Sequence, residues 1–293
     1  MEEKQDVYTR VTNKIIADLE LGNLTWHQPW QASHAAGPVS RPLRSTGELY
    51  QGINVLMLWA TAMEKGYDAP IWMTFKQASD LCAHVRKGEH GTLVVYAGSI
   101  TKHETDQDGN DVEEAIRFLK GYTVFNVEQI EGLPEHYYAR AEPKHQTPLE
   151  RIDAAERFLA GTGATIRHGG TKAFYRKSDD VVQMPELQAF ESKESYYAST
   201  THELTHWTRH LSRLDRSFDQ KRFGDAGYAM EELVAEIGSA FLCADLEITH
   251  EPSPDHAAYI ATWLKVLKND KKAIFTAAAH AKRAVDYLHR LQI

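Results

Sequence analysis

The sequence predicts an α+β protein of two domains, in which mixed helices and strands are followed by a mainly helical half with a small β-sheet. The chain has 293 residues, 42% of them hydrophobic, which is enough for two cores. Helical and strand-like patterns are mixed before residue 145, and helical spacing prevails after it. A polar stretch containing Pro143 and Pro148 separates the halves, so we predict domains of residues 1–145 and 146–293.

The first half begins with an amphipathic helix over residues 7–22, whose apolar residues recur at helical spacing and stop at Gly22. Residues 26–52 are polar, contain proline and glycine, and predict a loop. The remaining patterns predict helices over 53–66 and 74–85, the second with Thr74 as N-cap, and strands over 91–102 and 116–130. The acidic segment DQDGND between the strands lacks the glycine position of an EF-hand, which favours a hairpin tip.

The second half opens with an amphipathic helix over 149–161. Two short strand patterns follow at 165–170 and 173–185, and the segment DDVVQMP is interpreted as an edge strand. The rest of the chain predicts helices, including 194–211, with Tyr197, Leu204, Trp207 and Leu211 available for burial, and 228–242.

Composition limits the classes of function. The net charge of −8 argues against a protein whose whole surface follows a phosphate backbone, and the residues before 145 are the more acidic half. The charged N-terminal segment does not resemble a signal peptide, and no run of about 18 apolar residues occurs, so we expect a cytoplasmic protein without membrane contact. Cys82 and Cys243 are expected to be buried small side chains rather than ligands or disulfide partners.

Residues 201–207, THELTHW, contain an H-E-x-x-H motif. On a helix, His202 and His206 lie on one face about 6 Å apart, so both imidazoles can reach one ion. Glu203 projects nearby and can take a proton from a metal-bound water. Chance predicts this motif about 0.06 times in a chain of this composition, and a helix beside a strand is the setting that a zincin active site requires. The motif therefore predicts a zinc hydrolase site.

A catalytic zinc site needs a third protein ligand. His210 lies a further turn along the helix axis, too far to converge on the same ion. A second helix supplies Glu232 and Glu236, one turn apart. Either could bind the metal while the other orients a histidine, and we favour Glu232 as ligand and Glu236 as its support. Tyr228, one turn before Glu232, is a candidate to stabilise an oxyanion. Zinc is the expected metal, and manganese also suits these ligands.

The chain also resembles a known family. Residues 178–216 and 228–246 are similar to the metallopeptidase domain of the ArdC family of plasmid antirestriction proteins. Residues 47–59, 72–96 and 125–132 resemble that family's N-terminal single-stranded DNA-binding domain, which also stands at the front of some conjugative primases. The resemblance gives His202, Glu203 and His206 the zincin roles and Glu232 that of the glutamate ligand, although Glu236 stands where related gluzincins more often have aspartate. It implies a protein that protects incoming plasmid DNA from restriction endonucleases.

A DNA-binding surface is predicted in the first half. Trp26 and Trp30 stand in the polar loop, where their rings could stack on unpaired bases or instead pin the loop to the domain. Trp59 and Trp72 lie in apolar segments typical of a core. Basic side chains near the loop and near a glycine turn could contact phosphates, although an ordinary solvated turn explains the latter equally well. The predicted DNA-binding residues are Trp26, Trp30, Arg41, Arg44, Lys76, Arg86 and Lys87.

Three functions are compatible with the sequence. The leading hypothesis is an antirestriction protein that binds single-stranded DNA during conjugation and carries a metallopeptidase domain. A second is a regulatory metalloprotease that cleaves a repressor, a restriction-system protein or another peptide substrate, with DNA binding only for targeting. A third is a non-enzymatic acidic DNA mimic, although 33 lysine and arginine side chains stand beside 41 acidic ones.

Overall fold

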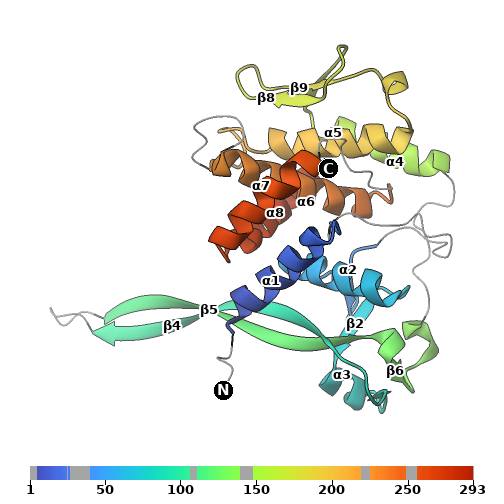
Figure 1. Cartoon of the computed structure of the whole chain (residues 1–293), viewed down its shortest axis with the longest axis vertical. Coiled ribbons are helices and arrows are strands. Elements are labelled where there is room, and N and C mark those ends of the chain that lie inside the picture. Colours follow the sequence, from blue (N-terminus) through green and yellow to red (C-terminus); the bar gives the residue numbers. More distant parts are fainter. Residues whose placement is uncertain are drawn as a thin grey trace.

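The computed structural model of the chain describes residues 5–24, 26, 40–105, 111–138, 148–218, 225–248 and 256–292 (Figure 1). Helices and strands alternate in the first half, and helices predominate in the second, which confirms the predicted α+β class. Within these residues, no helix combines the length and apolar character needed to cross a membrane.

The first half is built around a four-stranded sheet with the order β1-β2-β5-β4. Strands β1 and β2 are parallel, and the other neighbours are antiparallel. A separate pair, β3 and β6, lies beside it. The elements are α1 (Val7–Glu20), β1 (Leu43–Arg44), α2 (Ile53–Lys65), β2 (Ile71–Thr74), α3 (Phe75–Asp80), β3 (His84–Val85), β4 (Thr92–Thr105), β5 (Asp111–Asn126) and β6 (Ile130–Glu131), with single 3-10 turns at Val127–Gln129 and Glu135–Tyr137.

Local signals in the sequence set several of these boundaries. Thr74 caps α3 as predicted, because its hydroxyl accepts from the Gln77 backbone N–H while the Gln77 side chain accepts from the Thr74 backbone N–H. The helix ends earlier than expected, since Cys82 two residues later has φ 58°, a left-handed conformation that a helix cannot continue through. Cys82 is exposed, so its predicted burial is wrong, whereas Cys243 is buried as predicted.

Strands β4 and β5 form a long antiparallel ribbon, paired from Thr92↔Val124 to Thr105↔Asp111. The base of the ribbon lies against α1 and α2, and its outer part projects away from the body of the molecule (Figure 1). The hairpin tip predicted within DQDGND falls mostly on residues 106–110, outside the described residues, although the strands on both sides lead to it.

The second half places a three-stranded sheet over one side of a helical layer (Figure 1). The strand order β7-β9-β8 corrects the prediction for DDVVQMP, because β9 is the central strand and β8 is an edge. Val181, Val182 and Met184 are all buried, as expected of a central strand covered on both faces. The elements are α4 (Pro148–Gly161), β7 (Thr165–His168), β8 (Phe174–Arg176), β9 (Val181–Met184), a 3-10 turn (Leu187–Ala189), α5 (Lys193–Trp207), α6 (Ala226–Asp245), α7 (His256–Asn269) and α8 (Ala273–Arg290).

Helix α5 ends at Trp207, and the chain then turns. Leu211 is therefore 68% exposed, so the prediction that it would be buried with the rest of that helix is wrong. Tyr197, Leu204 and Trp207 are buried as predicted.

One large apolar core joins the two halves, because α1 and α2 lie between the first sheet and the helices of the second half (Figure 1). Trp59 on α2 meets Phe241 on α6 with ring centroids 5.8 Å apart, and Trp72 is also buried, which confirms the expectation for both tryptophans. The predicted domain boundary near residue 145 lies outside the described residues. The two halves are thus packed on each other through apolar contacts.

Candidate metal centre

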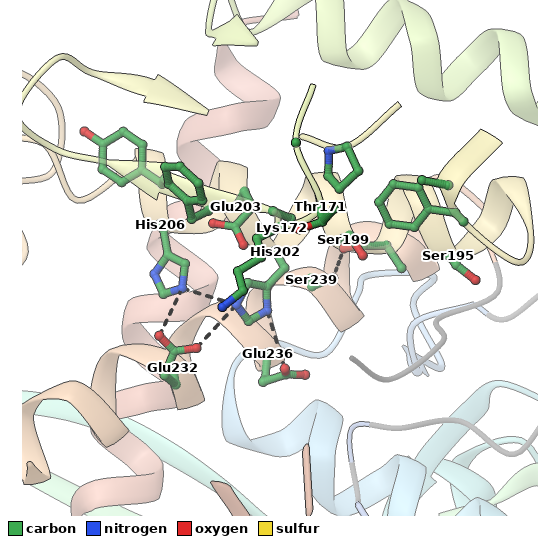
Figure 2. Close-up of a pocket in the computed structure, with 18 of the residues that line it drawn as sticks. Thr171, Lys172, Ser195, Ser199, His202, Glu203, His206, Glu232, Glu236 and Ser239 are labelled. Carbon is green, nitrogen blue, oxygen red and sulfur yellow. Dashed lines mark hydrogen bonds and ion pairs between the residues drawn. The ribbon is translucent and has the colours of Figure 1, made fainter. Parts of the chain in front are cut away.

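Helix α5 brings the two histidines of H-E-x-x-H together. Its N-cap is Ser192, whose hydroxyl accepts from the Ser195 backbone N–H and fixes where the helical spacing starts. The rings of His202 and His206 lie one turn apart with centroids 4.9 Å apart, and their Nε2 atoms are separated by 3.2 Å. Both Nε2 atoms therefore face one point in space (Figure 2).

Helix α6 supplies the carboxylate that faces these two nitrogens. Glu232 Oε2 lies 3.5 Å from His202 Nε2, and Glu232 Oε1 lies 3.5 Å from His206 Nε2. Two nitrogens bound to zinc at about 2.0–2.1 Å in a tetrahedron are about 3.3 Å apart, which is close to the observed separations. Among the described residues, His202, His206 and Glu232 are the group with donor atoms near enough to hold one ion. Donor types and spacing both fit a divalent metal.

The two helices approach closely because small residues face each other where they cross. A Cβ atom added to Gly238 would lie 2.6 Å from Thr205 Cγ2, a distance that real Cβ atoms do not show. One turn away, the hydroxyls of Thr201 and Ser239 are 2.9 Å apart. Gly238 on α6 thus lets the helix that carries Glu232 reach the histidines on α5.

Each histidine is held from behind by a second carboxylate. Glu236 Oε1 lies 3.4 Å from His202 Nδ1, and Glu231 Oε1 lies 3.0 Å from His206 Nδ1. An acceptor at Nδ1 favours the tautomer that leaves Nε2 free for a metal. Glu236 therefore lies where the sequence placed a supporting carboxylate, whereas Glu231 was not predicted.

Glu231 is itself fixed by Arg216, a buried guanidinium from the segment between α5 and α6. Arg216 donates to both Glu231 oxygens at 2.8 Å, and also to Thr208 Oγ1 and the Thr205 carbonyl. A bidentate pair of this kind is both strong and directional. The sequence carried a weak signal for it, since Glu231 is a carboxylate directly beside the expected ligand.

The pKa shifts in the cluster show that it attracts positive charge. Burial opposes protonation of His206, but the nearby carboxylates of Glu232 and Glu231 outweigh it and raise the His206 pKa to about 10. Burial also disfavours the anionic form of Glu231, yet the hydrogen bonds from Arg216 and His206 lower its pKa to about 2. The pKa of Glu232 is lowered too, because the two histidines overcome its burial. Burial raises the pKa of Glu236 to about 7.

The cluster opens into a cavity of about 920 Å³. Glu203 lines it beside His202, and Tyr228 lines it one turn before Glu232, with its hydroxyl 3.0 Å from that of Tyr259 (Figure 2 shows Glu203 and the ligand cluster). Edge strand β8 contributes Phe174 and Tyr175 to another wall. A cavity of this size, bounded by a strand edge, can admit a segment of polypeptide.

The structure separates the predicted DNA-binding residues. Trp26 has no exposed surface and packs edge-to-face on Trp263 at 5.6 Å, so its ring is closed to a base. Arg41 is 4% exposed, is paired with Asp245 at 2.5 Å and lies over the Phe241 ring, so it is closed to phosphate. The predictions for Trp26 and Arg41 are therefore wrong, because both residues tie the first half to α6 and α7. Trp30 lies outside the described residues.

The other predicted cations lie on the surface in separate places. Arg44 is paired with Glu48 at 3.3 Å, and Arg86 with Glu89 at 2.7 Å, which reduces their availability to phosphates. Lys76 on α3 and Lys87 in the turn after β3 are exposed. Sequence reasoning missed a second group of exposed aromatic side chains on the β4–β5 ribbon, including Tyr96 and Tyr122.

Comparison with protein families gives two matches in the expected order. Residues 5–125 match the N-terminal domain of anti-restriction factor ArdC, and residues 153–280 match a zincin-like metallopeptidase domain. The chain is 44% identical to the uncharacterized protein y4eC of Sinorhizobium fredii, covering 98% of this chain and 92% of that one. It is 40% identical to a DNA primase TraC of Escherichia coli, covering 98% of this chain but 27% of the primase.

Solved structures agree with these matches. The metal-free crystal structure of antirestriction protein ArdC from plasmid R388 superposes with a TM-score of 0.82 at 44% identity, and its Mn(II)-bound structure with 0.80 at 43% identity. Each comparison covers 98% of both chains. The resemblance noted in the sequence thus extends to the whole fold.

Proposed function

Since the chain belongs to the ArdC family of antirestriction proteins, we propose that it binds single-stranded DNA and protects incoming plasmid DNA from restriction endonucleases during conjugation. The relation to TraC primases, over the part of those proteins that this chain matches, supports a role in plasmid transfer. The same likeness supports DNA as the partner.

We further propose that the second domain is a metal-dependent peptidase, with a divalent ion held by His202, His206 and Glu232. The observation that carries this proposal is the buried triangle of two Nε2 atoms and one carboxylate, with edges of 3.2–3.5 Å. Zinc is the first choice for two imidazoles and a carboxylate, and the Mn(II)-bound relative makes manganese the second. When bound, such an ion lowers the pKa of a coordinated water and polarises a peptide carbonyl.

The side chains around the ligands have separate roles in this proposal. Glu203 lines the cavity next to His202 and would take a proton from water and deliver it to the leaving amine. Glu236 and Glu231 hold the two imidazoles through Nδ1. Tyr228 would donate to the oxyanion from the opposite wall, with its hydroxyl placed by Tyr259.

The second candidate function is cleavage of a peptide substrate from a repressor or a restriction-system protein, and the large cavity favours it. The two functions are separated by Glu203→Gln. This variant should keep its metal and lose about 10²- to 10⁴-fold in peptide hydrolysis, because a general base is removed. Glu186→Gln, an exposed carboxylate outside the cavity, is the matched control.

The variants are then compared in a plasmid-transfer assay with restricting and non-restricting recipients. Equal protection by wild type and Glu203→Gln would remove peptidase chemistry from the antirestriction role. Loss of protection by Glu203→Gln alone would make proteolysis part of it. Wild-type protein that protects without binding DNA would contradict the DNA-binding part of the proposal and favour a DNA mimic.

A further inference from the structure

We propose that single-stranded DNA binds to one face of the β4–β5 ribbon, on a platform formed by Tyr96, Phe118, Lys120 and Tyr122. This inference rests on the proposed DNA binding and assigns it a surface. The platform takes the place of Trp26 and Arg41 as the predicted DNA-binding residues, because both of these are buried.

The strand register places these residues on the same face. Tyr96 is paired with Lys120, Gly98 with Phe118, and Val94 with Tyr122. Directly opposed residues in an antiparallel pair project to the same side, and so do residues two apart along each strand. The three rings therefore form a continuous group, with centroids 6.1 Å apart for Tyr96–Phe118 and 6.4 Å for Tyr96–Tyr122.

The rings are open to solvent. Val94 is buried at the base of the ribbon, but farther out Tyr96 is 53% exposed and Tyr122 is 46% exposed. Ile100 and Ile116, paired on the same face, are exposed as well. Cross-strand contacts between the rings stabilise the ribbon, yet such contacts need only part of each ring surface. The remaining surface is available for bases, each of which has a face that can stack.

Gly98 shapes the platform. A Cβ atom at this position would lie 2.6 Å from Phe118 Cζ and 3.0 Å from Tyr96 Cε1. The Phe118 ring therefore lies across the backbone of β4 at its glycine, beside Tyr96. Larger residues here would lift the ring and break the continuity of the aromatic surface.

The local charge suits a polyanion, although the whole protein is acidic. Residues 92–101 and 115–124 contain no aspartate or glutamate, and Lys120 is on the platform face, whereas Arg117, paired with Ser99, projects to the other face. The Lys120 ammonium lies 5.1 Å from the centre of the Phe118 ring, on the platform itself. A cation among exposed rings fits a nucleic-acid strand, whose bases stack while its phosphates pair with the cation. An apolar partner would instead have to desolvate that ammonium.

The test is fluorescence anisotropy of the full chain with a labelled oligothymidylate of about 20 nucleotides. Tyr96→Ala and Tyr122→Ala should each raise Kd by about 5- to 100-fold, the equivalent of one lost stacking contact. Tyr96→Phe keeps the ring and should bind like wild type. Lys120→Gln should reduce the slope of log Kd against log salt by about 0.7.

Leu211→Ala is the matched control, because Leu211 beyond the end of α5 is a large apolar side chain with 68% exposure in the second half of the chain. It should leave Kd unchanged. Melting temperature and bound metal are measured for every variant, and Tyr96→Ala should match wild type in both. Loss of binding in Tyr96→Ala at an unchanged melting temperature, with binding retained in Tyr96→Phe, cannot come from misfolding.

If wild type binds the oligonucleotide and Tyr96→Ala and Tyr122→Ala bind it with the same Kd, the ribbon platform is overturned. The proposal that the protein binds DNA would then still stand. Equal weakening by Leu211→Ala would overturn the platform too. Failure of wild type to bind the oligonucleotide would remove the proposed DNA binding together with the platform. Duplex of the same length that binds as tightly as the single strand would contradict a stacking surface, since paired bases do not offer their faces.

Discussion

The α5–α6 pair and the β4–β5 ribbon are both formed by two neighbouring elements, but they carry functional side chains in opposite environments. Glu231, Glu236 and His206 lie in the interior, and each polar group there has a partner. Tyr96 and Tyr122 lie on a projecting ribbon with about half of each side chain in solvent. The helix pair is part of the large core that joins the two halves, whereas the outer part of the ribbon adds little to it.

The difference predicts how each region responds to change. A buried polar cluster is costly to disturb, because a lost partner leaves a charge without compensation. An exposed pair of strands tolerates substitution, because solvent replaces the lost contact. We therefore expect changes around the metal centre to affect stability and metal binding together, whereas changes on the ribbon should affect ligand binding alone.

The largest effect is expected from loss of a ligand. His202→Ala should lower metal affinity more than about 100-fold, since even supporting residues cost 10- to 100-fold. Metal content of purified protein and competition with a chelator provide the measurement. His210→Ala is the control, because this histidine bonds to Ser212 beyond the end of α5. If both variants kept the same metal, the proposed ligand set would be wrong.

The second-largest effect is expected from removal of the buried Arg216 guanidinium. Arg216→Met leaves the buried Glu231 carboxylate without its guanidinium partner. The change should reduce the free energy of unfolding by about 3–5 kcal/mol. Metal affinity should fall about 10- to 100-fold, because His206 loses its orientation. Urea unfolding and metal titration measure both quantities.

The control for that variant is Arg213→Met, which removes an arginine bound to Asp180 and stacked on Trp207. It should lower stability without changing metal affinity, since the Arg213 guanidinium donates to the Trp207 carbonyl, to Asp180 and to the Tyr175 hydroxyl. Unchanged metal affinity in Arg216→Met would show that Glu231 does not position His206.

Substitution of one glycine in each region allows a direct comparison of the α5–α6 pair with the β4–β5 ribbon. Gly238→Ala and Gly98→Ala each place a Cβ atom 2.6 Å from a neighbour. At Gly238 the neighbour is Thr205 inside the helix pair, so overpacking costs about 1–3 kcal/mol, partly offset by the better helix propensity of alanine. At Gly98 it is the far end of the Phe118 ring, which can move into solvent, so the cost should stay below about 0.5 kcal/mol.

Thermal and urea unfolding measure both glycine variants. Adding Thr205→Ala to Gly238→Ala should restore part of the stability, because it removes the atoms that the new methyl group meets. Equal costs at the two glycines would contradict the distinction between a packed helix pair and an open ribbon.

The smallest effect concerns pH. Burial, followed by the charges of Arg283 and Arg216, lowers the pKa of His280 on α8 from 6.5 to about 4. As the pH falls, His280 therefore binds a proton near pH 6.5 in the unfolded chain but only near pH 4 in the folded protein. This contribution to stability is complete above pH 6.5 and declines as the pH falls toward 4.

His280→Gln should flatten that decline by less than about 1 kcal/mol, because the side chain is only partly buried. Urea unfolding of wild type and variant across this pH range provides the measurement. An identical pH dependence in both proteins would show that His280 titrates normally.

The sequence by itself determined which side chains meet at the candidate metal centre, because their spacing along each helix is a local property. The spacing of His202 and His206 fixes their common face once the segment is helical, and in the structure the Ser192 N-cap starts that helix. The carboxylates of α6 are likewise one turn apart, and the structure brings Glu232 to 3.5 Å from His202 Nε2 and Glu236 to 3.4 Å from His202 Nδ1. Alternating apolar residues also predicted β4 and β5.

Tertiary structure decided which side chains are covered. Trp26 and Arg41 belong to a polar part of the sequence, and only their own contacts, Trp26 with Trp263 on α7 and Arg41 with Asp245 on α6, bury them. Arg216 and Glu231 meet because the chain turns back after α5, which no periodicity reveals. For the ribbon, alternation puts Tyr96 and Gly98 on one face of β4, but only the pairing with β5 adds Tyr122 to that face, and only the packing leaves it exposed. Periodicity is a property of neighbouring residues, whereas burial depends on distant ones.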